Sequence, residues 1–397
     1  MNRDFFRRNR QSLMGKIDSK LVVVAGNVAL QRSNDAAFAF AQEANFWYLT
    51  GINDAQWRLV ITDEKSWLIA PDIDEIHRIF DGGLSHSDAQ EISGVDEVIS
   101  FQDGETLLAT LLQTHEQVGS LGSDPHEEYY DFSLNPGPIV LLEFLRKQGA
   151  TVEDIRRPLA RLRAIKQPAE IAVMRQAIAV TIAGFERIKD KLDTYHYEYE
   201  IEADFTHAFV SAGASGHAYD PIVAAGKNAC TLHYVKNQAK LTPGEFVLLD
   251  IGASVDGYAA DISRTYAYGD ISDRQRAVHA AVEQAHLAII ELLRPGLVIA
   301  EYFAAVDDIM KRALTSLDLL ETESDYRKYF PHSISHGLGI DVHDSLGGPK
   351  ELQVGMVLTV EPGIYIPEEG IGVRIEDDIL ITETGHENLS QKLSTSL

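Results

Sequence analysis

Cysteine is nearly absent from this sequence. Its 397 residues include one cysteine, Cys230, which excludes an internal disulfide bond and any Cys-x-x-Cys motif for zinc binding or redox chemistry. A chain that makes no use of disulfide bonds fits a reducing compartment. We therefore expect a cytoplasmic protein.

Long apolar runs and an export signal are missing as well. The sequence has no stretch of about twenty apolar residues, the length that a membrane-spanning helix needs. The N-terminal segment MNRDFFRRNRQSLMGKID is basic but has neither the apolar core nor the small-residue cleavage site of a signal peptide. The sequence therefore predicts neither export nor a membrane partner.

Positive charge is scarce. The chain has 35 Lys and Arg residues against 60 Asp and Glu residues, which gives a formal net charge of −25. Such an excess repels the phosphates of nucleic acids over the surface as a whole, so we expect no nucleic-acid partner. Most acidic residues are expected on solvated faces, and only acids inside apolar segments need another explanation.

Two parts of the chain differ in pattern. Residues 1–156 alternate short apolar strands such as LVVVAG with helical segments such as VLLEFLRKQG, which predicts a smaller α/β domain. Pro168 then opens a long segment with helical spacing, as at the first turn of a helix. Residues 157–397 combine long helices with strand pairs joined by tight turns, so we expect an α+β architecture there.

Two acids stand inside the apolar arms of a predicted β-hairpin at residues 246–266, FVLLDIGASVDGYAADISRTY. If the turn centres on Asp256-Gly257, position 250 faces position 263, and Asp250 and Asp261 share one face. A turn centred one residue earlier would place the two acids directly opposite each other. A slip of one residue in the pairing would put them on opposite faces.

A second predicted hairpin, residues 357–382, repeats the pattern. Glu361 and Glu376 lie symmetrically about the turn-like PEEGIG. Carboxylates in apolar strands are either neutralised by cations or exposed at a sheet edge, because burying an unpaired carboxylate costs several kcal/mol. A divalent cation such as Mg²⁺, Mn²⁺ or Co²⁺ would neutralise several acids at once.

Histidines are clustered in YFPHSISHGLGIDVHDSLGG, residues 329–348, which contains His332, His336 and His343. The glycines argue against one continuous helix there, and the spacing does not identify which histidine is a ligand. His233, in NACTLHYVKN, is a weaker candidate on its own.

Together these segments resemble the aminopeptidase P and prolidase family, metallopeptidases with the pita-bread fold. The resemblance rests on the motifs LLDIG, YAADISRT, SHGLGIDVHD, VEPGIY and RIEDD, with FWYLTG near the N-terminus. It implies that residues 157–397 form a pita-bread domain, and that residues 1–156 mediate oligomerisation to a homodimer or homotetramer and closure of the substrate cleft. The implied metal ligands are Asp250, Asp261, His336, Glu361 and Glu376.

The resemblance also implies two divalent metal ions, manganese in the first place and cobalt or zinc as alternatives. A hydroxide that bridges them would attack the carbonyl before a proline, and Glu361 would carry a proton to the departing nitrogen. His233 and His343 would contact the substrate and stabilise the oxyanion, and Arg374 would orient a ligand or the substrate. Tyr219 and His332 match positions in the substrate pocket.

Three functions follow from this pattern. The first is a metal-dependent aminopeptidase that releases the residue before proline from the N-terminus of proline-containing peptides. The second is an Xaa-Pro dipeptidase, which uses the same metals but cleaves dipeptides alone. The third is a pita-bread binding module without catalysis, which the presence of all five ligand positions disfavours.

Overall fold

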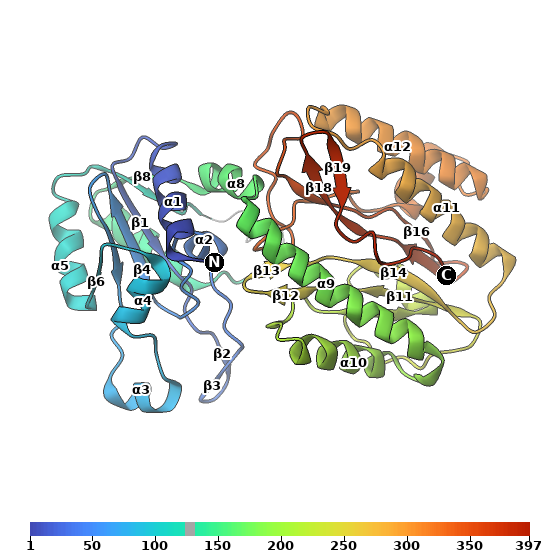
Figure 1. Cartoon of the computed structure of the whole chain (residues 1–397), viewed down its shortest axis with the longest axis horizontal. Helices are drawn as coiled ribbons and strands as arrows, with labels where there is room; N and C mark the ends of the chain where they lie inside the picture. Colours follow the sequence, from blue (N-terminus) through green and yellow to red (C-terminus); the bar gives the residue numbers. More distant parts are fainter. Residues whose placement is uncertain (124–131) are drawn as a thin grey trace. The chain divides into compact units, whose positions relative to one another are not determined.

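The computed structural model describes residues 1–123 and 132–397, and the chain divides into two units, Met1–Leu162 and Arg163–Leu397 (Figure 1). The boundary expected between residues 156 and 157 lies at the start of helix α8 (Arg156–Ala164), a little before this division. No helix in the described part of the chain is both long and apolar enough to cross a lipid bilayer.

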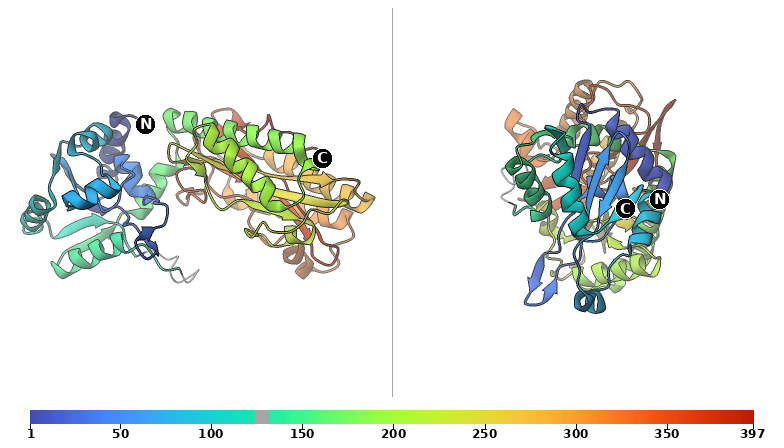
Figure 2. Two further views of the ribbon diagram at one scale, coloured as in Figure 1. Left: turned by 90° about the horizontal axis from the view of Figure 1, so that it is seen from below. Right: turned by 90° about the vertical axis from the view of Figure 1, so that its left-hand side faces the viewer.

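Unit 1 is built on a six-stranded mixed sheet with the strand order β6-β5-β4-β1-β7-β8. The right-hand view of Figure 2 shows these strands with helices on either side. The elements before α8 are α1 (Arg3–Met14), β1 (Leu21–Ala25), β2 (Gln31–Ser33), β3 (Ala36–Ala37), α2 (Ala44–Thr50), β4 (Arg58–Thr62), β5 (Ser66–Ile69), α3 (Glu75–Asp81), α4 (His86–Ser93), β6 (Glu97–Ile99), α5 (Phe101–Leu111), β7 (Gln117–Ser120), α7 (Pro136–Lys147) and β8 (Thr151–Asp154).

The aromatic run FWYLTG packs into the core of unit 1. This run forms helix α2, in which Phe46 and Tyr48 are buried and the Trp47 ring packs edge-on against Phe6 of α1, with ring centroids 5.7 Å apart. Strand β1 is buried along its whole length, as expected for a strand covered on both faces. The aromatic run therefore stabilises the fold of unit 1.

Unit 2 begins with helix α9 (Pro168–Lys191), and Pro168 stands in its first turn as predicted. The remaining elements are η1 (Leu192–Thr194), α10 (Glu198–Ser211), β9 (Gly216–His217), β10 (Ile222–Ala225), η2 (Gly226–Cys230), β11 (Glu245–Asp250), β12 (Ala253–Val255), β13 (Tyr258–Ala259), β14 (Ser263–Tyr268), α11 (Asp273–Ile290), α12 (Ile299–Ser316), α13 (Glu323–Tyr329), β15 (Val357–Val360), β16 (Gly363–Ile366), β17 (Ile371–Arg374), β18 (Asp377–Thr382) and β19 (Gly385–Asn388).

The two halves of unit 2 are built alike. Helices α9 and α10, side by side in Figures 1 and 2, share a hydrophobic core with strands β10, β11 and β14. Helices α11 and α12 share a second core with strands β15 to β18. Each half thus packs a pair of helices against one face of short antiparallel strands, which form the sheet β10-β11-β14 in the first half and the sheets β15-β18-β19 and β16-β17 in the second. The opposite face of these strands is free for other contacts.

The pairing register of both hairpins agrees with the prediction. In the first hairpin Asp250 pairs with Ser263, and the turn residues Asp256 and Gly257 have φ angles of 46° and 81°. Positive φ at both positions suits the tight hairpin turn that an Asp-Gly pair favours. In the second, Val360 pairs with Asp377 and Gly363 with Arg374, so one continuous register places Glu361 across from Glu376.

Side-chain alternation then turns the acids away from the helices. In β11, Val247 and Leu249 belong to the core beneath α9 and α10, so Asp250 points to the opposite face. In β17 and the residue that follows it, Val373 and Ile375 face the core beneath α11 and α12, so Glu376 points to the opposite face as well. The two halves of unit 2 therefore present their acids on faces free of helices.

Arg264 of β14 ties the second hairpin to the first. Its Nη1 donates to the Glu376 carbonyl at 2.7 Å, and its Nη2 donates to the Asp377 carboxylate at 2.7 Å. The Arg264 side chain is 1% exposed, whereas Arg175, which pairs with Glu387 at 2.6 Å, is 45% exposed. The two ion pairs have similar geometry and differ in burial.

This contrast predicts unequal costs of substitution. Arg264→Met leaves a carboxylate buried without its cation and should lower the free energy of unfolding by about 3–5 kcal/mol, whereas Arg175→Met should cost less than about 1 kcal/mol. Urea titrations followed by circular dichroism would measure both. All three tryptophans lie in unit 1, so a transition seen by circular dichroism but not by tryptophan fluorescence reports unit 2. Equal costs for the two variants would contradict the account.

Candidate metal centre

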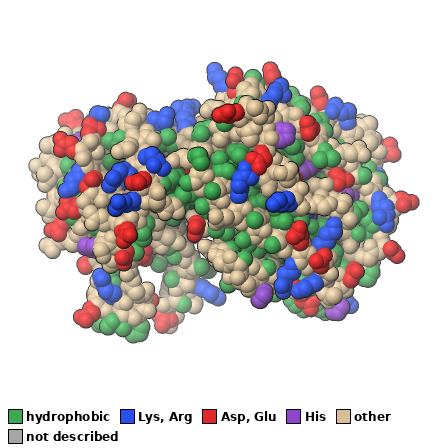
Figure 3. Space-filling model, viewed as in Figure 1, with side chains coloured by type: hydrophobic (Ala, Val, Ile, Leu, Met, Phe, Trp, Pro, Cys, Tyr) green, Lys and Arg blue, Asp and Glu red, His purple; other side chains and the backbone are tan. Residues whose placement is uncertain are grey.

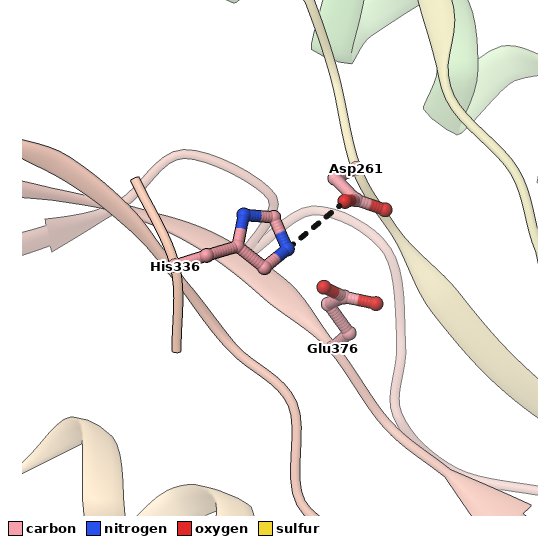
Figure 4. A group of neighbouring side chains, drawn as sticks. All are labelled: Asp261, His336 and Glu376. Atoms are coloured by element: carbon pink, nitrogen blue, oxygen red, sulfur yellow. Dashed lines mark ion pairs between the residues drawn. The ribbon is translucent and has the colours of Figure 1, made fainter. Parts of the chain in front are cut away.

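Three predicted ligands converge at the centre of unit 2. Asp261 precedes β14, Glu376 lies between β17 and β18, and His336 comes from the segment before β15. One ligand atom from each side chain lies within 4.8 Å of the others, and Figure 4 shows the three groups pointing toward one another. Asp261 and Glu376 are buried, and His336 is partly buried. This distance suits a single cation held by all three.

Asp250 joins this group through Tyr219. The Tyr219 hydroxyl lies 2.7 Å from Asp250 Oδ1 and 2.6 Å from Asp261 Oδ1. A hydroxyl carries one proton, so it can donate to only one of the two carboxylates at a time. Arg374 Nη2 donates to the other oxygen of Asp250 at 2.5 Å. The two acids are thus close together and share the single Tyr219 proton.

Glu361 closes the cluster from the second hairpin. Its Oε1 lies 3.5 Å from His336 Nε2, and its Oε2 lies 3.5 Å from His332 Nδ1. His336 Nε2 is also 3.4 Å from Asp261 Oδ2. All five side chains that the resemblance assigns to metal binding therefore lie in one cluster.

Arg374 is the centre of a hydrogen-bond network behind the acids. Besides Asp250, it donates through Nη1 to the Tyr365 hydroxyl at 2.8 Å and through Nε to Ser263 Oγ at 2.9 Å. Ser263 Oγ in turn donates to Glu376 Oε2 at 2.7 Å. Arg374 therefore fixes one acid from each hairpin, directly or through Ser263.

His332 extends the same network. Its Nδ1 donates to the Ser333 carbonyl at 2.7 Å, so its Nε2, 2.9 Å from the Tyr365 hydroxyl, accepts in the neutral tautomer. Burial and, to a smaller extent, the positive charge of Arg374 together lower the pKa of His332 to about 4. His332 is therefore uncharged at neutral pH and cannot neutralise Glu361.

His233 and His343 stand on the solvent side of the cluster, where both are exposed. The rings of His343 and His336 are 4.3 Å apart between centroids. Partial burial lowers the pKa of His343, and positive charge on His336 and His233 lowers it further. These two exposed imidazoles are thus available to a molecule that approaches the acids from solvent.

The acids show the electrostatic effect of crowding. Burial raises the pKa of Glu361 to about 7, although the charges of His336 and Arg374 oppose the shift. Burial also raises the pKa values of Asp261 and Glu376, and neighbouring carboxylates raise both further. Burial disfavours the charged form of His336, but Asp261 and Glu361 outweigh it and raise its pKa to about 9. Negative charge is in excess, as at a cation site.

Sequence reasoning missed three polar groups of this site: Ser263, Tyr365 and Asp378. Counting every second residue from Asp261 would have found Ser263, and the same count from Glu376 would have found Asp378. Asp378 is fully buried; its Oδ2 accepts from the Asp261 amide at 3.2 Å, and its Oδ1 finds no hydrogen-bond donor in the described part of the chain. Tyr365 ends the motif VEPGIY, but the motif does not reveal its hydrogen bond with Arg374 across the hairpin.

The donor set fits divalent cations. Four carboxylates and one imidazole supply mostly hard oxygen ligands, which suit Mn²⁺, Co²⁺, Zn²⁺ or Mg²⁺. The shared Tyr219 proton and the unpaired oxygen of Asp378 show that protein groups alone do not balance the negative charge. The arrangement can therefore bind cations next to two accessible histidines.

Comparisons with known proteins agree with this chemistry. Residues 172–383 match the model of Metallopeptidase family M24, and residues 6–119 match that of the aminopeptidase P N-terminal domain. Xaa-Pro aminopeptidase of Escherichia coli K12 is 35% identical over 98% of this chain and 95% of its own length. Human Xaa-Pro aminopeptidase 3 is 33% identical over 91% of this chain and 76% of its own length.

Solved structures are similar over the same span. Aminopeptidase P from E. coli with the inhibitor Pro-Leu matches with a TM-score of 0.88 at 32% identity, over 100% of this chain and 96% of that chain. A zinc-substituted form of that enzyme in complex with product gives the same values.

We expect removal of divalent ions to destabilise unit 2 more at pH 8 than at pH 5. Without metal, Glu361 has a pKa of about 7 against 4.5 ordinarily, and His336 about 9 against 6.5. A raised folded-state pKa stabilises the fold below the unfolded pKa, and that stability is lost as pH rises through the folded pKa. The free energy of unfolding of metal-free unit 2 should therefore fall as the pH rises from about 4.5 to about 9, the range that the pKa values of Glu361 and His336 span.

Thermal melts by circular dichroism, with EDTA or with added Mn²⁺ at each pH, would measure this effect. The difference in Tm between the two conditions should be larger at pH 8, and the tryptophan-reported melting of unit 1 serves as the internal control. If the difference in Tm is the same at pH 5 and pH 8, or is larger at pH 5, the acids are solvated and need no cation.

Proposed function

The chain belongs to metallopeptidase family M24, and from this membership we propose that it is a metal-dependent aminopeptidase that removes the N-terminal residue of peptides with proline in second position. The observation that carries the proposal is the convergence of Asp261, His336 and Glu376, with Asp250 and Glu361 beside them, in a chain similar to Xaa-Pro aminopeptidases along nearly its whole length. The expected fold, an N-terminal α/β domain followed by a pita-bread domain, is confirmed by the match to aminopeptidase P structures.

The cation site would use both hairpins. We propose that Asp250, Asp261, His336, Glu361 and Glu376 would hold two divalent ions. In such sites, divalent ions polarise the scissile carbonyl and lower the pKa of water, so that hydroxide forms near neutral pH. We propose manganese in the first place, because the donors are mainly oxygen, with cobalt or zinc as alternatives.

The histidines would stabilise charge on the substrate. His233 and His343 are exposed beside the buried acids, so their N–H groups can donate to the carbonyl oxygen as it becomes negative. His332 and Tyr219 would line the pocket as uncharged groups. This role of His332 is supported by its lowered pKa of about 4.

Glu361 would carry a proton. Its carboxylate lies 3.5 Å from both His336 Nε2 and His332 Nδ1, inside the acid cluster, where it would accept a proton from the attacking water and pass it on. The nitrogen of proline would leave as a strongly basic amide anion, so it must be protonated as the C–N bond breaks. Arg374 supports this chemistry from behind by fixing Asp250 and, through Ser263, Glu376.

Peptide length separates the proposed function from its alternatives. With Mn²⁺ present, we expect Ala-Pro-Ala-Ala to be cleaved after alanine at least as efficiently as Ala-Pro, measured as kcat/KM by release of free alanine. Turnover confined to the dipeptide would establish an Xaa-Pro dipeptidase instead. A metal-loaded protein that cleaves neither peptide would indicate a binding module.

Replacement of Glu361 tests the proton transfer. Glu361→Gln keeps the shape but cannot carry the proton, and should lower kcat by about 10²–10⁴-fold, the usual contribution of general acid–base catalysis. Glu368→Gln is the matched control, because Glu368 lies in the turn of the same hairpin and pairs with Lys328 at 2.7 Å, outside the acid cluster. Near-normal turnover by Glu361→Gln would overturn the assignment.

We also propose that the protein is a cytoplasmic homodimer or homotetramer that associates through unit 1, where association would help to close the substrate cleft. Helix α3 supports self-association, because its side chains Ile76, Ile79 and Phe80 are exposed, Phe80 by 81%. Figure 3 shows hydrophobic side chains at the lower end of unit 1, where Figure 1 labels α3. The single Cys230 suits a reducing compartment. Light scattering would distinguish these assemblies from a monomer.

A further inference from the structure

A buried ion cluster lies against the segment that carries the histidines. The cluster consists of Arg163, Lys166 and Asp344. Arg163 Nη2 lies 3.0 Å from Asp344 Oδ1, and Lys166 Nζ lies 3.3 Å from Asp344 Oδ2. All three side chains are nearly inaccessible to solvent, and the lysine and the aspartate are 178 residues apart in sequence.

Asp344 ends a tight loop, His336 to Asp344, which we call the histidine loop. Gly337 pairs with Asp344 in an isolated β-bridge, and a Cβ added to Gly337 would lie 2.5 Å from the Asp344 carbonyl oxygen. His336 and His343 therefore stand at the two ends of the loop, with their rings 4.3 Å apart. A shift of Asp344 would move the neighbouring His343 directly.

The histidine loop is held on two sides. The Ala259 amide, beside the first hairpin turn, donates to the Gly339 carbonyl at 2.9 Å. On the other side, the Asp344 carboxylate is fixed by the two cations and also accepts from the Ser345 amide at 2.8 Å. The exposed His343 ring has no such anchor of its own, because its described ring contact is with His336. The position of His343 thus depends on the backbone next to it.

Stability alone is a poor reason for this cluster. Burying three charges costs several kcal/mol per ion, and well-packed apolar residues often replace buried ion pairs without loss of stability. A buried ion pair tolerates little movement, however, because separating its partners leaves two unpaired charges away from water, which costs several kcal/mol. Such a cluster is therefore well suited to hold one loop in one position.

We propose that Asp344 is a positioning residue for the peptidase reaction: locked by Arg163 and Lys166, it holds the His343 imidazole where it can donate to the developing oxyanion. This inference rests on the proposed function, in which His343 contacts the substrate. Asp344 itself does not need to touch the substrate.

Asp341 provides a matched control within the same loop. Its Oδ2 lies 2.5 Å from Arg163 Nη2, but its side chain is 55% exposed, against 3% for Asp344. Neutralising Asp341 leaves Asp344 paired with both cations, so it removes an ion pair from the loop without releasing the buried anchor.

Kinetics of four variants test the proposal: Asp344→Asn, Asp341→Asn, His343→Ala and the double variant Asp344→Asn/His343→Ala. We expect Asp344→Asn to lower kcat by about 10–100-fold with little change in KM, because misplacing one oxyanion donor weakens transition-state binding. Asp341→Asn should stay close to wild type. In the His343→Ala background, Asp344→Asn should have almost no further effect, because the two residues act through one contact. An equal loss in both backgrounds would overturn the proposal.

Amide hydrogen exchange provides a readout that is independent of activity. In Asp344→Asn we expect faster exchange across residues 337–345 than in Asp341→Asn, with unchanged metal content and unchanged exchange in helices α11 and α12. Unchanged exchange in the histidine loop of Asp344→Asn would also overturn the proposal. If wild type cleaves no Xaa-Pro peptide, the proposed function fails, and the exchange result shows separately whether Asp344 anchors the loop.

A second variant tests the same role if Asp344→Asn does not fold. Lys166→Met removes one cation but leaves the Arg163–Asp344 contact. Lys166→Met should lower kcat by a smaller factor than Asp344→Asn does, and only when His343 is present. A loss that does not depend on His343 would contradict the positioning role.

Discussion

Repulsion among buried carboxylates is the constraint on which the centre of unit 2 depends. Asp250, Asp261, Glu361 and Glu376 come from two hairpins, and the main cations that the chain supplies to them are Arg374 and His336. Burial raises the pKa values of Asp261, Glu361 and Glu376, so the metal-free site favours protonated acids. Divalent ions would remove this conflict, and they would also provide the chemistry for peptide hydrolysis. Binding of the cations and stability of the fold are therefore linked.

The positions of these acids follow from local rules that the sequence displays. The Asp256-Gly257 turn predicts the register in which Asp250 pairs with Ser263, and alternation along the strand places Asp250 and Asp261 on one face. The same reasoning about the turn PEEGIG relates Glu361 to Glu376. These features were predictable because the residues that determine them are close together in the chain.

The supporting groups could not be predicted in this way, because they depend on contacts between distant segments. The bond from Arg264 to Asp377 spans 113 residues, and that from Lys166 to Asp344 spans 178. Tyr365 and Asp344 end the motifs VEPGIY and SHGLGIDVHD, but these motifs do not show which distant residues the two side chains contact. Three buried cations of unit 2 nevertheless hold site residues or the segments beside them: Arg374 holds Asp250, Arg264 holds the Glu376 backbone, and Lys166 holds the loop of His343.

The central claim is that the two hairpins form a cradle for two divalent ions, and metal content tests it most directly. After equilibration with Mn²⁺ and removal of free ions, mass spectrometry of the bound metal should give about two ions per chain for the wild type, as in two-metal hydrolytic sites. Asp261→Asn, which changes a proposed ligand, should bind fewer, and Asp256→Asn, in the turn of the same hairpin, should still bind two. A wild-type protein that retains no divalent metal, or an Asp261→Asn variant that retains both ions, would contradict the account.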